Sequence, residues 1–146
     1  IRKNTKDAII IVGTPKWCQL LDQVDPSKIN NTHHIMYSFH FYAATHINLL
    51  PLFEKEIHRI PVMVTEWGVC ENTGNGNINF ENSDKYIETM KQHVLNNDTI
   101  SISWMLFSYG DKKEAASVLE PESCINKKWN NMSPTGFYIR KKFWAK

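Results

Sequence analysis

The pattern of apolar and polar positions predicts four β-strands, each followed by a helix. Residues 8–12 and 61–64 are apolar on both faces, which is typical of strands buried inside a parallel sheet. Residues 36–42 alternate large side chains with small or polar ones and favour a second strand, and residues 99–104 favour a fourth. Successive strands are spaced at roughly 30 residues, the usual length of a βαβ unit.

Helical periodicity fills the intervals between the strands and follows the last of them. Apolar side chains recur at helical spacing in four stretches, at residues 20–24, 49–60, 86–94 and 134–144. Asn82 or Ser83 is expected to cap the third of these helices. Ser133, followed by Pro134, is expected to open the fourth.

This alternation predicts an α/β fold with a parallel sheet and right-handed crossovers. Two architectures fit: a small doubly wound sheet, or four of the eight units of a (β/α)₈ TIM barrel. A dinucleotide-binding sheet needs a glycine-rich turn after its first strand, and Gly13 is the only glycine in that turn. No linker divides residues 1–146, which are predicted to form one segment, shorter than the roughly 250 residues of a whole barrel.

Charge and composition exclude several kinds of partner. The chain has 17 basic and 15 acidic side chains, so neither nucleic acid nor a membrane surface is expected as a partner. No apolar run approaches the roughly 20 residues of a membrane span, and the first residues are not expected to be a signal peptide.

The six histidines lack the spacing of metal ligands, so no metal or other cofactor is expected. The three cysteines allow at most one internal disulfide.

Polar and aromatic side chains gather at the carboxyl ends of the predicted strands, where barrels and open α/β sheets bind their ligands. Packing alone would explain any one of them, but their recurrence at four strand ends favours a carbohydrate site. Trp rings stack on sugar faces. Glu66 is the main candidate for chemistry, because a buried charge is costly unless it is paired or used. The residues are Trp17, His40, Tyr42, Glu66, Trp67 and Trp104.

Four motifs together resemble the C-terminal half of glycoside hydrolase family 5, in particular its bacterial and rumen-type endo-β-1,4-glucanases. They are Ile11-Val12-Gly13-Thr14 with Trp17, Phe39-His40-Phe41-Tyr42-Ala43-x-Thr45-His46, Val64-Thr65-Glu66-Trp67-Gly68, and Ser103-Trp104. The resemblance covers essentially the whole chain. It implies half of a TIM barrel, strands five to eight with their helices, and an enzyme that hydrolyses internal β-1,4-glucosidic bonds in cellulose or related β-glucans.

The resemblance also implies roles for individual residues. Glu66 would be the nucleophile of a retaining double-displacement mechanism, Tyr42 would hydrogen-bond it, and His40 would belong to the same network. Trp104 would form an aromatic platform beneath the sugar at the cleavage site. Further contacts with sugar are implied for Trp17, His46, Asn72, Thr73, Lys112 and Glu114.

The second carboxyl group of a retaining glycosidase is missing. Such enzymes hold two carboxyl groups about 5–5.5 Å apart, and the family's acid/base lies in an Asn-Glu-Pro motif that this sequence lacks. Glu71 and Glu114 are the nearest substitutes, and both are expected in loops. Three interpretations stay open: a piece of a full endoglucanase, a natural half that assembles with an N-terminal half-barrel, or a half-barrel that pairs with a second copy as a homodimer.

Two other functions stay open as well. One is a catalytically incompetent half-barrel that binds oligosaccharide or serves as a structural, self-associating module. The other is a barrel of the same family that acts on mannan or xylan. If the substrate is polymeric cellulose, which cannot enter a cell, the enzyme is expected to be secreted.

Overall fold

The computed structural model describes residues 1, 3–4, 6–95 and 98–144. Its central element is a three-stranded sheet in the order β1-β2-β3, and both strand pairs are parallel. The strands are β1 (Ile10–Val12), β2 (Ile35–Tyr42) and β3 (Val62–Gly68). The predicted parallel sheet is therefore confirmed.

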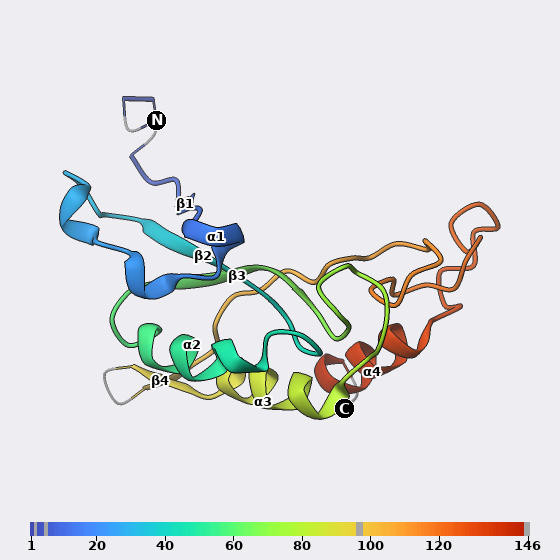
Figure 1. Ribbon diagram of the computed structural model, residues 1–146. Coiled ribbons are helices and arrows are strands. Elements are labelled where there is room, and N and C mark those ends of the chain that lie inside the picture. The colour runs from blue at the N-terminus through green and yellow to red at the C-terminus, as the bar shows by residue number, and fades with distance from the viewer. Residues whose placement is uncertain (2, 5, 96–97, 145–146) are drawn as a thin grey trace.

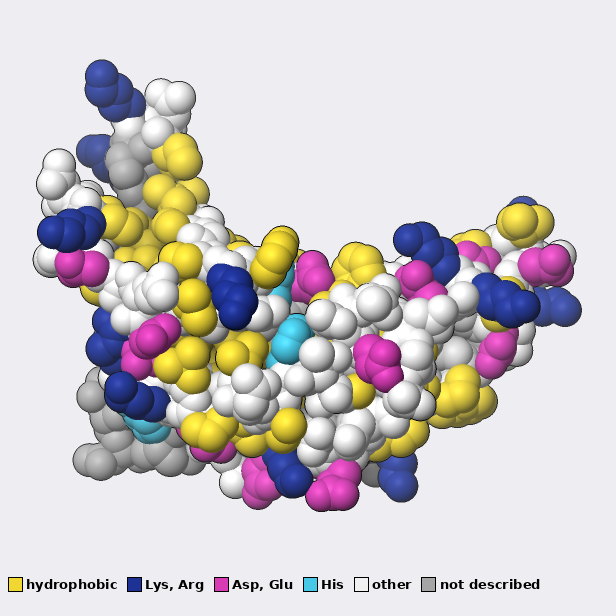
Figure 2. Space-filling model, viewed as in Figure 1, with side chains coloured by type: hydrophobic (Ala, Val, Ile, Leu, Met, Phe, Trp, Pro, Cys, Tyr) yellow, Lys and Arg dark blue, Asp and Glu magenta, His cyan; other side chains and the backbone are white. Residues whose placement is uncertain are grey.

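Three longer helices follow the strands. They are α2 (Leu50–Glu56), α3 (Phe80–Lys91) and α4 (Pro134–Phe143), and they lie along one side of the molecule (Figure 1). On another side the surface is hollowed between the N-terminal arm and the C-terminal loops (Figure 2). No helix among the described residues is long and apolar enough to cross a membrane.

Several short elements connect these parts. The turn α1 (Pro15–Cys18) follows β1, and an antiparallel hairpin of β4 (His93–Leu95) and β5 (Asp98–Ile100) follows α3. The described residues also form 3₁₀ turns at Leu21–Gln23, Pro26–Lys28 and Ile47–Leu49. The helix predicted over residues 20–24 is therefore a single 3₁₀ turn. All three cysteines are free thiols.

The predicted fourth strand forms only in part. Its first residues pair within the β4–β5 hairpin instead of joining the central sheet. Further along, the chain runs parallel to β3: the Val64 amide donates to the Ser103 carbonyl at 3.0 Å, and the Met105 amide donates to the Val64 carbonyl at 2.8 Å. Trp104 and Val64 form an isolated parallel bridge. The hairpin takes up residues that the sequence pattern assigned to the sheet.

The N-cap predicted for α4 is confirmed, whereas the N-cap predicted for α3 is not. Ser133 caps α4 as predicted, because its Oγ accepts a hydrogen bond from the Gly136 amide at 3.1 Å. The cap of α3 is Asn79, whose side chain accepts from the Asn82 amide at 2.9 Å. The prediction of Asn82 or Ser83 was wrong, because Asn79 offers the same chemistry three residues earlier.

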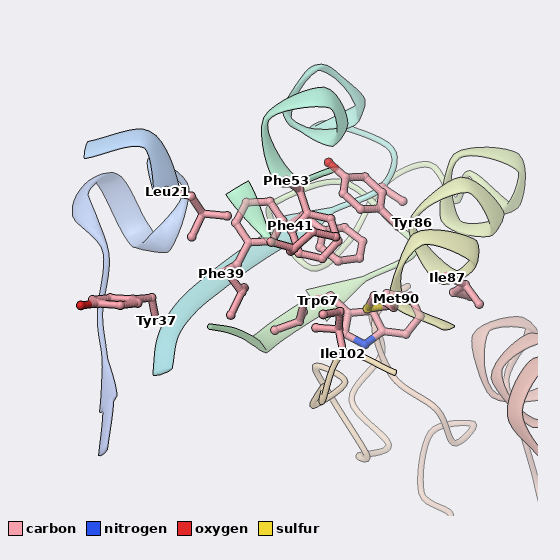
Figure 3. Close-up of a cluster of buried hydrophobic side chains, with 14 of the residues drawn as sticks. Leu21, Tyr37, Phe39, Phe41, Phe53, Trp67, Tyr86, Ile87, Met90 and Ile102 are labelled. Atoms are coloured by element: carbon pink, nitrogen blue, oxygen red, sulfur yellow. The ribbon is translucent and has the colours of Figure 1, made fainter. Parts of the chain in front are cut away.

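The core lies between the sheet and the helices (Figure 3). Phe39 of β2 stacks on Phe53 of α2 with ring centroids 4.8 Å apart, and Phe41 stacks on Tyr86 of α3 at 3.7 Å. Trp67 of β3 packs beside Phe41 at 5.5 Å. All five rings are fully buried. Because side chains alternate along a strand, the residues between these on β2 face away from the helices.

Gly136 in the first turn of α4 allows the helix to approach the preceding loop closely. A Cβ there would lie 2.1 Å from the Val118 carbonyl oxygen. Gly136→Ala is therefore expected to lower the free energy of unfolding by about 1–3 kcal/mol, measured by urea denaturation. Gly110→Ala is the matched control, because its Cβ would meet only Ser108 Oγ at 3.5 Å. Equal losses in the two variants would rule out this steric explanation.

Candidate active site

A β-bulge near the end of β3 places Glu66. Phe39 pairs with Val64, but the next residue of β2, His40, pairs with Glu66, so that Thr65 is an extra residue in β3. Strict alternation would direct Glu66 to the same face as Val64, which is fully buried in the core. With the bulge, Thr65 and Glu66 are both half-buried and both contact side chains of β2.

The Glu66 carboxylate lies against two side chains of β2. The Tyr42 hydroxyl donates a hydrogen bond to Glu66 Oε1 at 2.8 Å, and His40 Nδ1 lies 3.8 Å from Glu66 Oε2. Burial, together with this hydrogen bond to Glu66, raises the pKa of Tyr42, so the hydroxyl stays protonated and remains a donor. Burial lowers the pKa of His40 below its ordinary value, although the nearby Glu66 charge opposes the shift. The imidazole is therefore mainly neutral at neutral pH.

These three side chains line an open cleft of about 570 Å³ at the carboxyl ends of the strands. In Figure 2, histidine and acidic side chains are visible near the middle of the hollowed edge of the molecule. The remaining lining residues are Trp17, Cys18, Gln19, His46 and Asn72. The structure thus brings six of the predicted site residues into one cleft.

His46 holds the backbone at the base of the cleft. Its Nδ1 accepts a hydrogen bond from the Tyr42 amide at 3.0 Å, and its Nε2 lies 3.4 Å from Gln19 Nε2. The Tyr86 hydroxyl donates to the His46 carbonyl at 2.7 Å. Burial, and secondarily the charge of Lys16, lowers the pKa of His46. His46 therefore connects the end of β2 to the turn that follows β1.

Trp17 and Asn72 lie at the rim. The Trp17 side chain is 81% exposed, and its backbone has a left-handed φ of 53°. The Asn72 amide donates to Thr45 Oγ1 at 3.0 Å, which ties the loop after β3 to the loop after β2. Thr73 is exposed, accepts a hydrogen bond from the Asn75 amide at 3.3 Å, and does not line the cleft.

Besides Thr73, three further predicted sugar contacts lie outside the Glu66 cleft. Lys112 and Glu114 line a separate cavity of about 680 Å³ in the long loop that precedes α4. The Trp104 ring lies edge-on to Trp67 at 5.8 Å and only 4.3 Å from the Phe143 ring. Trp104 thus packs with core side chains and lines a hollow on the α4 side.

Phe107 is an aromatic residue that sequence reasoning did not single out. Its amide donates to the Trp67 carbonyl at 2.9 Å, so it lies beside the end of β3, and its side chain is 38% exposed. Trp104, by contrast, pairs with Val64 in the middle of β3. What distinguishes Phe107 from Trp104 is the register of residues 104–107 against β3, and only the structure shows this register.

Neither Glu71 nor Glu114, the two side chains considered as a second carboxyl group, lines the Glu66 cleft. Glu71 Oε1 accepts hydrogen bonds from the Asn77 amide at 3.2 Å and from Asn77 Nδ2 at 2.8 Å, so its carboxylate holds its own loop. Within the part of the chain that the structure describes, no cluster of three or more His, Cys, Asp or Glu side chains is arranged to hold a metal ion.

Comparison with known proteins gives the site its context. Residues 1–113 match the model of the cellulase family, glycosyl hydrolase family 5. Endoglucanase E-5 of Thermobifida fusca is 34% identical over 152 residues, which cover 97% of this chain and 31% of that protein. Endoglucanase Z of Dickeya dadantii is 36% identical over 125 residues, which cover 84% of this chain and 28% of that protein. The chain therefore spans about a third or less of the length of these curated relatives.

Solved structures agree on the fold. Cellulase Cel5C_n superimposes with a TM-score of 0.84 at 31% identity, over 99% of this chain and 43% of that one. A variant of the catalytic domain of Thermobifida fusca endoglucanase Cel5A, in complex with cellotetraose, gives 0.80 at 30% identity, over 99% of this chain and 48% of that one. The parallel sheet with its helices is thus part of a TIM barrel, and the chain belongs to the cellulases of glycosyl hydrolase family 5.

Proposed function

We propose that the protein to which this chain belongs is a secreted enzyme that hydrolyses internal β-1,4-glucosidic bonds in cellulose or related β-glucans. The four units here are strands five to eight of its barrel, and Glu66 is the nucleophile. One observation carries the proposal: in an open cleft, the Glu66 carboxylate is hydrogen-bonded by Tyr42 and faced by His40. The relatives are endoglucanases by name, and one solved structure contains bound cellotetraose, which supports the substrate class.

The chemistry is a double displacement. In the first step the Glu66 carboxylate attacks the anomeric carbon, forming a glycosyl ester as the glycosidic bond breaks, and the departing sugar oxygen takes a proton from an acid. In the second step the conjugate base of that acid deprotonates a water molecule, which hydrolyses the ester and frees the Glu66 carboxylate. Tyr42 holds Glu66 Oε1 by a hydrogen bond of 2.8 Å, which orients the carboxylate and leaves the Oε2 lone pairs available.

The proposed mechanism needs an acid in addition to Glu66. Among the described residues, Glu66 is the only carboxylate that lines the cleft, whereas a retaining enzyme needs a second one about 5–5.5 Å away. The solved relatives contain roughly as much chain again, because this chain covers only 43–48% of them. We propose that an N-terminal half-barrel, of the same polypeptide or of a separate one, supplies this acid.

Two surfaces are suited to such a half-barrel. β1 is the edge of the sheet, and the side chains of Ile11 on this strand and of Ile9 just before it are exposed. On the side of α4, the exposed side chains of Met105, Tyr109 and Trp144 surround a hollow of about 560 Å³. An unpaired strand edge and an exposed apolar patch both favour association. A second copy of this chain would close the sheet but would bring another Glu66 rather than an acid/base motif.

Hydrolysis of a soluble β-1,4-glucan by the purified chain, with its oligomeric state measured on the same sample, tests the proposal. The chain is assayed alone and after addition of an N-terminal half-barrel from a family 5 endoglucanase. With the N-terminal half-barrel present, we expect hydrolysis of the glucan, and we expect Glu66→Gln to abolish it. A folded complex without activity, in which Glu66→Gln still binds oligosaccharide, would instead identify a binding module.

Tyr42→Phe is expected to slow formation of the glycosyl-enzyme by roughly ten- to a hundredfold. A hydrogen bond to a charged group contributes about 1.5–3 kcal/mol, and Phe keeps the ring while losing the donor to Glu66 Oε1. The rate is measured as the burst of dinitrophenolate released from dinitrophenyl β-cellobioside. Tyr109→Phe is the control, because Tyr109 is exposed and lies outside the cleft. Equal rates in the two variants would argue against the role of Tyr42.

A further inference from the structure

Two hydroxyl groups lie behind His40, on the side of the ring away from Glu66. Thr65 Oγ1 is 2.8 Å from His40 Nε2, and Ser38 Oγ is 3.3 Å from the same nitrogen. The two hydroxyls also hydrogen-bond each other. The other ring nitrogen, Nδ1, faces Glu66 Oε2 at 3.8 Å. The imidazole thus lies between a hydroxyl pair and a carboxylate.

The backbone explains why these groups meet. Ser38 and His40 are two residues apart on β2 and therefore share a face. The bulge in β3 directs the consecutive residues Thr65 and Glu66 to that same face, one on each side of the His40 ring. Thr14 Oγ1 donates to the Ser38 carbonyl at 3.0 Å in a buried hydrogen bond, which holds β2 at this point. The arrangement is therefore built from three segments of the fold.

The protons of this cluster favour one tautomer of His40. Ser38 is only 4% exposed, and its hydroxyl has no partner other than Thr65 and His40 among the described residues. Within the cluster, both hydroxyl protons find an acceptor only if Nε2 is unprotonated and accepts one of them. In the opposite tautomer the unprotonated Nδ1 would direct its lone pair at the Glu66 carboxylate, which is repulsive. Both considerations place the ring proton on Nδ1.

We infer that Thr65, supported by Ser38, is a positioning residue that holds His40 in the tautomer with its proton on Nδ1, facing Glu66. The Nδ1–H group then presents its positive end to Glu66 Oε2, while Tyr42 donates to Oε1. Both carboxylate oxygens are oriented before a substrate arrives. The catalytic consequence rests on the proposed role of Glu66, whereas the tautomer itself does not.

Nitrogen-15 NMR of histidine-labelled protein at neutral pH tests the tautomer directly. The two-bond proton–nitrogen correlations distinguish a protonated from an unprotonated ring nitrogen, and the His40 signals are assigned by their loss in His40→Gln. We expect an unprotonated Nε2 in the wild type, in Thr65→Ser and in Ser38→Ala, because each keeps a hydroxyl donor to Nε2. The double variant Thr65→Val with Ser38→Ala is expected to give a mixture of tautomers. A protonated Nε2 in the wild type, or an unchanged double variant, would overturn the inference.

A kinetic measurement on the same variants tests the consequence. The double variant is expected to form the glycosyl-enzyme from dinitrophenyl β-cellobioside roughly ten- to a hundredfold more slowly, and Thr65→Ser is expected to retain the rate. Circular dichroism and urea denaturation show whether each variant is folded. If the wild type has the expected tautomer but Glu66 does not react, the proposed function is refuted and the inferred tautomer stands. Reaction at Glu66 with the rate unchanged in the double variant would refute the positioning role alone.

Discussion

Glu66→Gln is expected to abolish transfer of a cellobiosyl group to this chain. The amide has the size of the carboxylate and still offers Tyr42 an acceptor oxygen, but it is too weak a nucleophile to form the glycosyl ester. Loss of a nucleophile lowers catalysis by on the order of 10⁴-fold or more. No other substitution in the cleft is expected to have so large an effect.

An activated substrate isolates this step. Dinitrophenolate leaves without taking a proton, so its cellobioside reacts without a general acid. The carboxylate forms one ester bond to the anomeric carbon as the bond to dinitrophenolate breaks. Absorbance measures the released dinitrophenolate, and a deoxyfluoro analogue, which slows hydrolysis of the ester, allows mass spectrometry to locate the labelled residue.

Glu71→Gln provides the matched control for Glu66→Gln. Glu71 lies five residues further along the chain, but its carboxylate holds the Asn77 loop and does not line the cleft. This variant is expected to be labelled at Glu66 like the wild type. A label on another carboxylate, or undiminished labelling of Glu66→Gln, would show that Glu66 is not the nucleophile.

Arg59→Ala is expected to cause the largest loss of stability, about 3 kcal/mol. Glu56 is only 1% exposed, and Arg59 forms a short hydrogen-bonded ion pair with it. The Arg59 guanidinium also donates to the Val24 carbonyl from Nη1 and to the Leu21 carbonyl from Nη2, each at 2.9 Å. Removing it leaves a buried carboxylate whose one other ion-pair partner, within the described part of the chain, is Lys55 at 3.6 Å, and breaking such a pair costs about 3–5 kcal/mol.

Urea denaturation of three variants tests this prediction. Lys55→Ala is the control, because Lys55 is largely exposed and lies 3.6 Å from the same carboxylate, so its loss is expected to cost less than about 0.5 kcal/mol. Arg59→Lys keeps the charge but cannot reach two carbonyls and a carboxylate at once, so an intermediate loss is expected. A loss in Arg59→Ala no greater than that in Lys55→Ala would contradict the structural role of the pair.

The elements that could be predicted are those whose signals are local. In β2, Phe39 and Phe41 alternate with smaller or polar residues, and both pack against helices as a half-buried strand requires. Ser133 beside Pro134 is a cap that acts within one helical turn. The same local reasoning misplaced the cap of α3, because several Asn and Ser residues follow one another there and helix propensity does not distinguish among them.

The fourth strand and the sugar contacts assigned to it depend on pairing between distant segments. Residues 99–100 have the same β propensity whether they join the sheet or the β4–β5 hairpin, and the structure has the hairpin. The family resemblance implies that Trp104 lies beneath the sugar at the cleavage site, and that role stays a prediction. Its ring packs against Trp67 and Phe143, and its backbone pairs with the middle of β3. The register of one strand on another is a property of two segments, which a single sequence does not contain.

The amino-acid sequence by itself determined which residue types stand at the strand ends, and with them the family and the carboxylate at position 66. Only the tertiary structure decided which way that carboxylate faces. Strand alternation would direct Glu66 into the core with Val64, and the bulge at Thr65 instead brings it beside Tyr42 and His40. A bulge is a difference in the number of residues between two paired strands. It therefore arises when β2 and β3 pair, and the sequence of either strand alone does not predict it.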